Sequence, residues 1–148
     1  MAGVRFAAVT AEVSTGTSVK TIVQVVAASN HRILIDRATV TFQGTSTTDA
    51  PILVEMLRQS TAGTMSSLTP VKLNSADDET LQVTARHTAT AEPTAGDVLE
   101  SFLVHPQGGK EWLAPFGRAI VVPGGGRLGV RVTAGVSVDC VVSLHGEE

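Results

Sequence analysis

Apolar and polar residues alternate along several short segments of this chain. Residues 127–133 (RLGVRVT) place Leu128, Val130 and Val132 on one face, and residues 136–144 (VSVDCVVSL) repeat the pattern. A period of two is typical of half-buried antiparallel strands. The same reasoning predicts further strands at 4–13, 19–28, 33–43, 51–58, 80–86, 98–104 and 118–122.

Turn-forming residues separate most of these segments, and Val and Thr, which favour strands, are abundant. Eight or nine short strands at regular spacing predict a sandwich or a barrel. We expect an all-β fold, a jelly-roll-like antiparallel β-sandwich of about eight strands, because this fold houses eight strands in a chain of about this length. Residues 1–148 are expected to form a single domain, with residues 1–16 as an N-terminal arm or an edge strand. The predicted turns lie at 14–16, 29–31, 44–49, 74–78, 92–96, 106–109 and 123–126.

Two segments are less regular. Residues 51–59 combine an initial proline with good helix formers, which fits a helix, but their period-two pattern favours a strand. Residues 60–78 form the longest irregular stretch. We expect a surface excursion there, with a short extended piece around Val71–Leu73.

Two other segments are too apolar for a strand with one face in water. They are residues 22–28 (IVQVVAA) and 118–122 (RAIVV). Either both faces are covered inside the domain, or one face lies against another subunit, as in natural oligomers. The sequence leaves both alternatives open.

Composition excludes several classes of protein. Hydrophobic residues make up 43% of the 148 residues and charged residues 17%, which is too apolar for a disordered chain. The net charge of −3, without a run of Lys or Arg, argues against a nucleic-acid partner. The sequence has neither a long apolar window nor a signal-peptide pattern, so we expect a soluble protein made in a cytoplasm, with no membrane partner.

Candidate chemistry is sparse. The four histidines, His31, His87, His105 and His145, do not pair at metal-ligand spacings. Cys140 lies on the apolar face of the last predicted strand, where we expect it to pack in the core as a small hydrophobe. We therefore predict no catalytic, metal-binding or cofactor-binding residues, no cofactor, and no enzymatic activity.

Three loop motifs could have either a structural or a ligand-binding role. The acidic triplet Asp77-Asp78-Glu79 lacks the glycine and the spaced ligands of a calcium loop, so we expect a solvated turn. Residues 123–126 (PGGG) are interpreted as a hairpin turn rather than a phosphate cradle. The stretch 105–118 holds Trp112 and Phe116 among prolines and glycines; it fits a binding anchor or a plug that closes the end of the sandwich, and we favour the plug.

Several stretches between residues 33 and 148 share a similar succession of strand-forming and turn-forming residues. They are RATVTFQG, PILVEMLRQSTAGTMSSLTPVKL, ATAEPT, AEPTAGDVLESFLVHPQGGKEWLAPFGRAIVVPGGGRLGVRVTA and the closing VSLHGEE. In these stretches the chain resembles small proteins encoded among the structural genes of tailed bacteriophages and prophages. The resemblance implies a capsid decoration (cement) protein that binds the major capsid protein on the outer surface of the virion head. It also implies synthesis in the host bacterial cytoplasm and assembly as a homotrimer.

An adhesive protein of this kind needs contact residues. Within 4–13, apolar residues alternate so that the segment can present an apolar face to a neighbour or add a strand to its sheet. We expect a homotrimer; the alternative is a monomer whose apolar strands lie in the middle of both sheets. The alternative function is a tail or host-recognition jelly roll that binds a glycan or a receptor. The candidate partner contacts are Val4, Phe6, Val9, Trp112 and Phe116.

Overall fold

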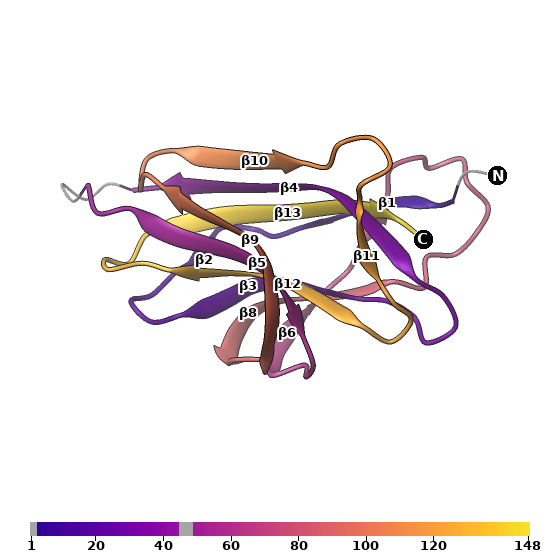
Figure 1. Cartoon of the computed structure of the whole chain (residues 1–148), viewed down its shortest axis with the longest axis horizontal. Helices are drawn as coiled ribbons and strands as arrows, with labels where there is room; N and C mark the ends of the chain where they lie inside the picture. The colour runs from indigo at the N-terminus through magenta and orange to yellow at the C-terminus, as the bar shows by residue number, and fades with distance from the viewer. Residues whose placement is uncertain (1–2, 45–48) are drawn as a thin grey trace.

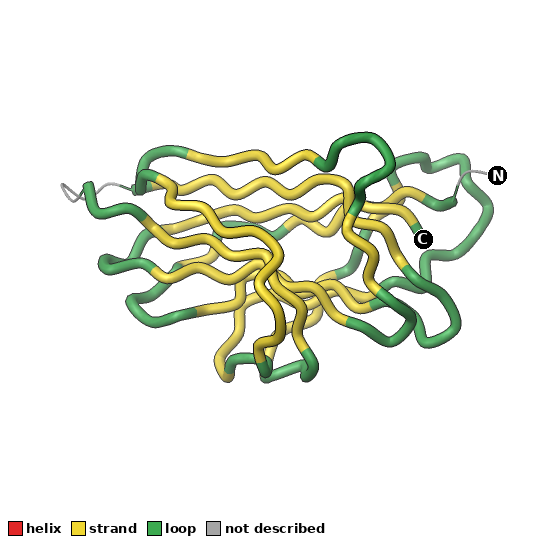
Figure 2. Tube along the Cα trace, in the orientation of Figure 1, coloured by secondary structure: helices red, strands yellow, loops and turns green. Residues whose placement is uncertain are grey.

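The chain folds into two antiparallel β-sheets that pack face to face. The computed structural model describes residues 3–44 and 49–148, and this part of the chain forms thirteen strands and no helix (Figures 1 and 2). The predicted all-β sandwich is confirmed. The choice of a strand over a helix for residues 51–59 is also confirmed, because β5 spans Ile52–Gln59. The turn predicted at 44–49 lies mostly outside the described residues.

Seven strands form the first sheet, here called sheet A. Its main order is β10-β4-β13-β1-β7. The short strand β11 also pairs with β4, next to Ile33–Ile35, and β2 also pairs with β13. The strands are β1 (Arg5–Val9), β2 (Val13–Ser14), β4 (Ile33–Gln43), β7 (Val71–Lys72), β10 (Gly109–Leu113), β11 (Ile120–Val122) and β13 (Asp139–Glu147).

Six strands form the second sheet, sheet B, in the order β6-β8-β3-β12-β5-β9. The segment between β5 and β9 supplies strands to both sheets, since β6 and β8 join sheet B whereas β7 joins sheet A. The ends of β6, β8 and β9 extend together away from the body of the sandwich at the bottom of Figure 1. The remaining strands of sheet B are β3 (Lys20–Val26), β6 (Thr64–Leu68), β8 (Thr84–Ala91), β9 (Ala95–Val104) and β12 (Arg127–Thr133).

The core lies between the sheets and is built by the alternation seen in the sequence. Leu128, Val130 and Val132 of β12 are all buried there, as are Val138, just before β13, and the predicted core residues of β13, Cys140 included. Fully burying an aliphatic side chain of this kind contributes about 1.5–3 kcal/mol. Val136 was predicted to share the buried face, but it precedes β13 and is exposed.

The N-terminal segment contributes β1 and β2 to sheet A, and among the described residues β2 lies at an edge of the sheet, because it pairs with β13 alone. Strand β1 pairs with β13 along its whole length and with β7 on its other side. Phe6, predicted as a partner contact, is 0% exposed and belongs to the core cluster. The predicted alternation of this segment is confirmed, but its apolar side faces the chain's own core instead of a neighbour.

Both faces of residues 22–28, in and after strand β3, are covered within the domain rather than by another subunit. Its central residues are buried on both faces, Val23 toward the core and Gln24 on the outer side of sheet B. Ile22 is an extra residue in the pairing with β12, where Val23 lies opposite Val130 and Thr21 opposite Arg131. This bulge puts Thr21 and Gln24 on the same outer face, although they are three positions apart. The chain therefore covers this strand by itself.

Two local predictions differ from the structure. Residues 109–113 were expected in a loop, but they form β10 because the long strand β4 offers them hydrogen-bonding partners. The predicted hairpin at 123–126 is wrong, since β11 lies in sheet A and β12 in sheet B. The turn passes so close to Ser29 that a Cβ on Gly124 would lie 2.7 Å from the Ser29 carbonyl oxygen.

Candidate functional site

Exposed apolar side chains concentrate on the outer side of sheet A. Among the described residues, six of the ten exposed large hydrophobic residues belong to β1, β7, β10 and β11 or to the segments directly after β7 and β10. In β10 and β11, Trp112, Ile120 and Val122 pack against the core, so the alternating Leu113 and Val121 point outward. The six residues are Val9, Val71, Leu73, Leu113, Phe116 and Val121.

Three hollows adjoin at one end of this face. A central hollow of about 310 Å³ shares Arg5 and Leu73 with a hollow of about 280 Å³ beside β1. It also shares Asp36 and Ala114 with a third hollow of about 550 Å³ beside the loop 114–119. The hollow beside β1, here called the acidic hollow, is lined by Gly3, Val4, Arg5, Leu73, Asn74, Asp77 and Glu79.

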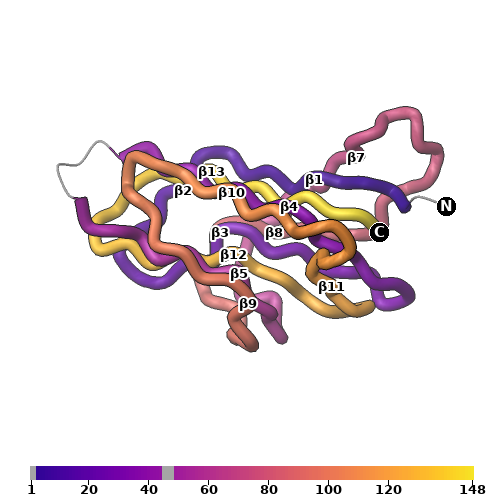
Figure 3. Tube along the Cα trace, turned by 45° about the horizontal axis from the view of Figure 1, so that its top comes forward, coloured from indigo at the N-terminus to yellow at the C-terminus, as the bar shows by residue number. Residues whose placement is uncertain are grey.

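Two loops border these hollows from opposite sides. Residues 73–83 leave β7 as a long excursion, and residues 114–119 connect β10 to β11. Both loops lie at the same end of the sandwich (Figures 1 and 3). Leu73 and Leu113, at the start of each loop region, both line the central hollow and supply most of its apolar lining.

The floor of the central hollow is charged. Arg37 donates from Nε and Nη2 to Oε2 of Glu111, at 2.9 and 2.7 Å. Arg5 lies 3.5 Å from Asp36, measured from Nη2 to Oδ2. Arg37 also donates from Nη1 to Nδ1 of His145 at 3.5 Å, which requires that nitrogen to be unprotonated.

Two groups of this floor, His145 and Asp36, are perturbed by their surroundings. Burial, and next the charge of Arg37, lower the pKa of His145 below its usual value of 6.5. Within the described chain, Oδ1 of Asp36 is buried and has no hydrogen-bond partner. A concave surface that combines apolar side chains with an unsatisfied polar atom and a perturbed titratable group is a candidate binding site.

The structure separates the five predicted partner contacts. Phe6 is buried in the core and is not available to a partner, whereas Val9 is exposed on the outer side of sheet A. Val4 is half-buried, pairs with Glu148 through two backbone hydrogen bonds of 3.0 and 3.1 Å, and lines the acidic hollow. The two aromatic candidates differ as well: Trp112 packs against the core from β10, whereas Phe116 is fully exposed.

Sequence reasoning missed most of the residues that build the hollows. Leu73, Leu113 and Val121 were not singled out, and neither were Arg37 and His145 as neighbours. The alternation of Trp112 with Leu113 was the available signal, but it has this meaning only in a strand, and residues 109–113 were expected in a loop. The charged neighbours come from different strands, and their proximity depends on the register of those strands.

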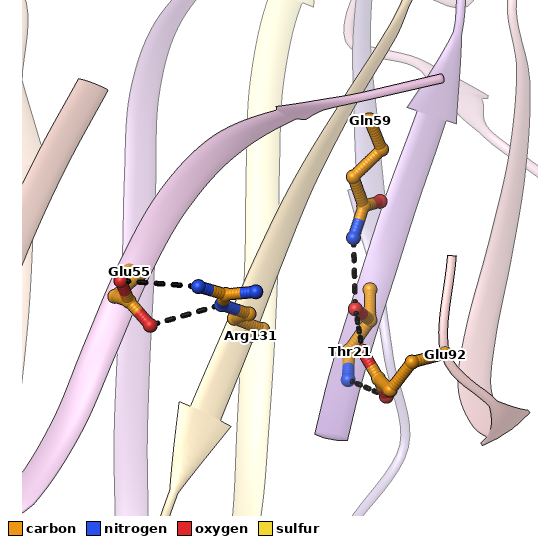
Figure 4. Close-up of polar contacts among 5 residues, drawn as sticks. All are labelled: Thr21, Glu55, Gln59, Glu92 and Arg131. Atoms are coloured by element: carbon orange, nitrogen blue, oxygen red, sulfur yellow. Dashed lines mark hydrogen bonds and ion pairs between the residues drawn. The ribbon is translucent and has the colours of Figure 1, made fainter. Parts of the chain in front are cut away.

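A second polar cluster lies on the outer face of sheet B (Figure 4). Thr21 donates from its backbone nitrogen and its hydroxyl to the Glu92 carboxylate, at 2.6 and 2.7 Å, and accepts from Gln59 at 2.9 Å. Gln24 donates to Gln59 at 2.7 Å. These side chains satisfy one another, so the cluster fastens the turn at Glu92 onto the sheet and leaves little free for a ligand.

Cys140 and the acidic triplet at residues 77–79 have structural roles, as the sequence predicts. Cys140 is buried as predicted, and burial together with nearby Asp139 raises the pKa of its thiol to about 12. Asp77 lies in a turn, where its side chain accepts from Asn74 at 2.7 Å. Among the residues that the structure describes, no group of three or more His, Cys, Asp or Glu side chains could hold a metal ion.

Comparisons with known proteins add no relative. No protein-family model, no curated protein and no solved structure matches this chain. In residues 3–44 and 49–148, no helix is long and apolar enough to cross a membrane.

Proposed function

We propose that this chain is a structural protein of a tailed-phage virion, a decoration protein that binds the outer surface of the capsid. The partner is the major capsid protein, and the contact is adhesive rather than catalytic. The observation that carries the proposal is the outer side of sheet A, where exposed apolar side chains surround three adjoining hollows. Apolar patches of this kind on a folded chain mark interaction surfaces. The resemblance to virion proteins supplies the class of partner.

The strand order supports a jelly roll as the finer description of the sandwich. Eight strands, in chain order β1, β3, β4, β5, β9, β10, β12 and β13, alternate between the sheets except that β5 and β9 are neighbours in sheet B, in the manner of that fold. Sheet A orders them as sixth, third, eighth and first, and sheet B as second, seventh, fourth and fifth. The segment from β6 to β8 is then an insertion between the fourth and fifth strands of the roll. The fold alone carries no function.

The homotrimer belongs to the proposal as well. The apolar strand β3 does not support it, because both faces of β3 are covered within the chain. The support comes from Leu113, Phe116 and Val121, which stay exposed on or beside the edge strands β10 and β11. A trimer would multiply weak contacts with the capsid through effective concentration.

The alternative of a tail or host-recognition module has less support. A module that binds a glycan or a receptor needs an exposed aromatic side chain, and Trp112, one of the predicted contacts, packs against the core. Phe116 is the one aromatic ring of the loop that is free to meet a glycan or a receptor.

Cosedimentation tests the proposal with capsids assembled from the major capsid protein of the same gene cluster. We expect saturable binding of the wild-type chain, and loss of binding in Leu113→Ser. Leu103→Ser is the matched control, because Leu103 is 72% exposed on β9 of sheet B and Leu113 is 62% exposed on β10 of sheet A. A wild-type chain that stays in the supernatant at every capsid concentration would contradict the proposal.

A further inference from the structure

One wall of the acidic hollow belongs to residues 73–83, here called the excursion. Four of the residues that line this hollow come from the excursion, and the other three come from the N-terminal segment. The excursion runs from the end of β7 to the start of β8, and none of its residues, all of which the structure describes, lies in a strand. The shape of the hollow therefore depends on the contacts that fasten the excursion at its two ends.

The near end of the excursion is fastened by β1 and by a turn of its own. Leu73 donates its backbone N–H to the Arg5 carbonyl at 2.9 Å, directly after the pairing of β7 with β1. Lys72 donates from Nζ to the Asp77 carbonyl at 2.6 Å, and the Asn74 side chain donates to the Asp77 carboxylate at 2.7 Å. These hydrogen bonds hold the first half of the excursion.

The far end of the excursion is fastened by one carboxylate. Oε1 of Glu148 accepts from the backbone N–H of Gln82 at 2.8 Å, and Oε2 accepts from the backbone N–H of Val83 at 2.7 Å. The Glu148 side chain is only 5% exposed, and Nε2 of His31 lies 3.5 Å from its Oε2. Apart from the bond to Gln82, no hydrogen bond joins residues 78–82 to the rest of the described chain.

Glu148 also fixes the opposite wall of the acidic hollow. Its backbone N–H donates to the Val4 carbonyl at 3.0 Å, and its carbonyl accepts from the Val4 N–H at 3.1 Å. Val4 lines the hollow. Strand β1, the end of β13 and the excursion lie together at one end of the sandwich (Figures 1 and 3). The backbone of Glu148 thus holds one wall of the hollow, and its side chain holds the other.

We propose that Glu148 is a positioning residue, whose carboxylate holds the excursion against the sandwich and keeps the acidic hollow formed before a partner binds. The inference rests on the proposed function, in which the outer side of sheet A, together with this hollow, binds the capsid. A segment that is already ordered costs less free energy on binding. Apparent affinity falls when only a fraction of the molecules has the binding-competent conformation. Glu148 therefore acts on capsid binding through the excursion.

NMR relaxation of the backbone amides tests the positioning role, with circular dichroism to check folding. In the wild type, residues 79–82 should have order parameters near those of rigid backbone, about 0.85, and in Glu148→Ala they should fall below about 0.6. In Glu148→Gln they should lie in between, because the amide keeps one acceptor oxygen but turns a donor toward the second N–H. A general loss of stability does not produce this local change in the folded state.

Glu92→Gln is the matched control. The Glu92 carboxylate also accepts from a backbone N–H, that of Thr21 at 2.6 Å, but it does so on sheet B. This variant should leave the excursion as rigid as in the wild type. Wild-type order parameters at residues 79–82 in Glu148→Ala would overturn the inference. Wild-type values in Glu148→Gln alone would overturn the role of the carboxylate, because a side chain that only fills space would explain them.

Cosedimentation with capsids separates this inference from the proposed function. Glu148→Ala should bind capsids about tenfold more weakly than the wild type, because the partner must then order the excursion itself. Glu92→Gln should bind like the wild type. Unchanged binding of a Glu148→Ala chain with a mobile excursion would overturn the link between the excursion and the capsid. A wild-type chain that binds no capsids would overturn the proposed function, and the relaxation data would still decide whether Glu148 positions the excursion.

Discussion

The two outer faces of the sandwich differ in how far the chain completes them by itself. On sheet B, Gln24 and Gln59 are 0% and 5% exposed. Gln24 donates to the Thr61 carbonyl, and Gln59 donates to Thr21, whose hydroxyl donates in turn to Glu92. On sheet A, Leu113 and Phe116 remain in solvent beside a charged floor. The polar cluster on the outer face of sheet B therefore serves stability, whereas the outer side of sheet A keeps side chains exposed to solvent.

An ion pair on each sheet shows the same contrast. Arg131 and Glu55 lie opposite each other on β12 and β5, with side chains 22% and 13% exposed, and bind through two hydrogen bonds of 2.9 and 3.3 Å (Figure 4). Arg37 of β4 and Glu111 of β10 are diagonal neighbours, because Arg37 pairs with Leu113 and Glu111 pairs with Thr39. Their side chains are 42% and 49% exposed. Water therefore screens the pair on sheet A more strongly.

The largest expected difference in the free energy of unfolding is between residues on the two sides of strand β1 in sheet A. Phe6→Ala should lower the free energy of unfolding by about 3–5 kcal/mol, because it leaves a cavity in the core. Val9→Ala, on the outer side of the same strand, should change it by less than about 0.5 kcal/mol. Urea denaturation of both variants measures the difference. Equal losses would contradict the placement of β1.

The next effect tests the buried polar cluster of sheet B. Gln59→Leu removes the acceptor of Gln24 and the donor to Thr21, and should cost about 2–3 kcal/mol, since a buried polar group left unpaired is expensive. Gln43→Leu is the matched control on sheet A, where the side chain is exposed, and it should cost less than about 0.5 kcal/mol. A neutral Gln59→Leu would show that the cluster is dispensable.

A smaller difference separates the two ion pairs. Double-mutant cycles with Arg131→Met and Glu55→Gln should give a coupling of about 1–3 kcal/mol, as expected for hydrogen bonds to charged groups. The cycle with Arg37→Met and Glu111→Gln should give less than about 1 kcal/mol and should fall further in 1 M salt. Couplings of equal size would remove the contrast between the two faces.

Much of the fold could be predicted because alternation reports directly on strands. Leu128 and Cys140 were placed in the core correctly, and β5 was distinguished from a helix by its period of two. Alternation does not say what covers a face, however, and so Phe6 was assigned to a partner while its own core buries it. The bulge at Ile22, which brings Thr21 to the side of Gln24, breaks the pattern itself.

The candidate site was less predictable than the fold. Phe116 was identified because it stands among proline and glycine, and the structure leaves it exposed. Leu113 escaped because Gly109–Leu113 become a strand only through pairing with β4, which lies about seventy residues earlier in the chain. Arg37 and His145 meet through the register of β4 and β13, which local sequence does not specify.

The smallest expected effect is a pH dependence of the free energy of unfolding, caused by His145 in the central hollow. Burial and the charge of Arg37, with a smaller effect of Arg5, lower the pKa of His145, and the carboxylates of Asp36 and Glu111 oppose this. Between the lowered pKa and 6.5, the unfolded chain binds more protons at this site than the folded chain. The free energy of unfolding therefore rises with pH through this window and levels off above it, and the contribution is lost as the pH falls.

Urea denaturation between pH 5 and pH 8 measures this slope. His145→Gln should flatten it, because glutamine does not titrate. Arg37→Met should reduce it in the same direction, because the pKa of His145 then moves back toward its usual value. The slope of Glu55→Gln, which alters the ion pair of sheet B, should keep the contribution of His145. If wild type and His145→Gln share one slope, the floor of the hollow does not hold His145 in the neutral form, and its hydrogen bond from Arg37 is not maintained in solution.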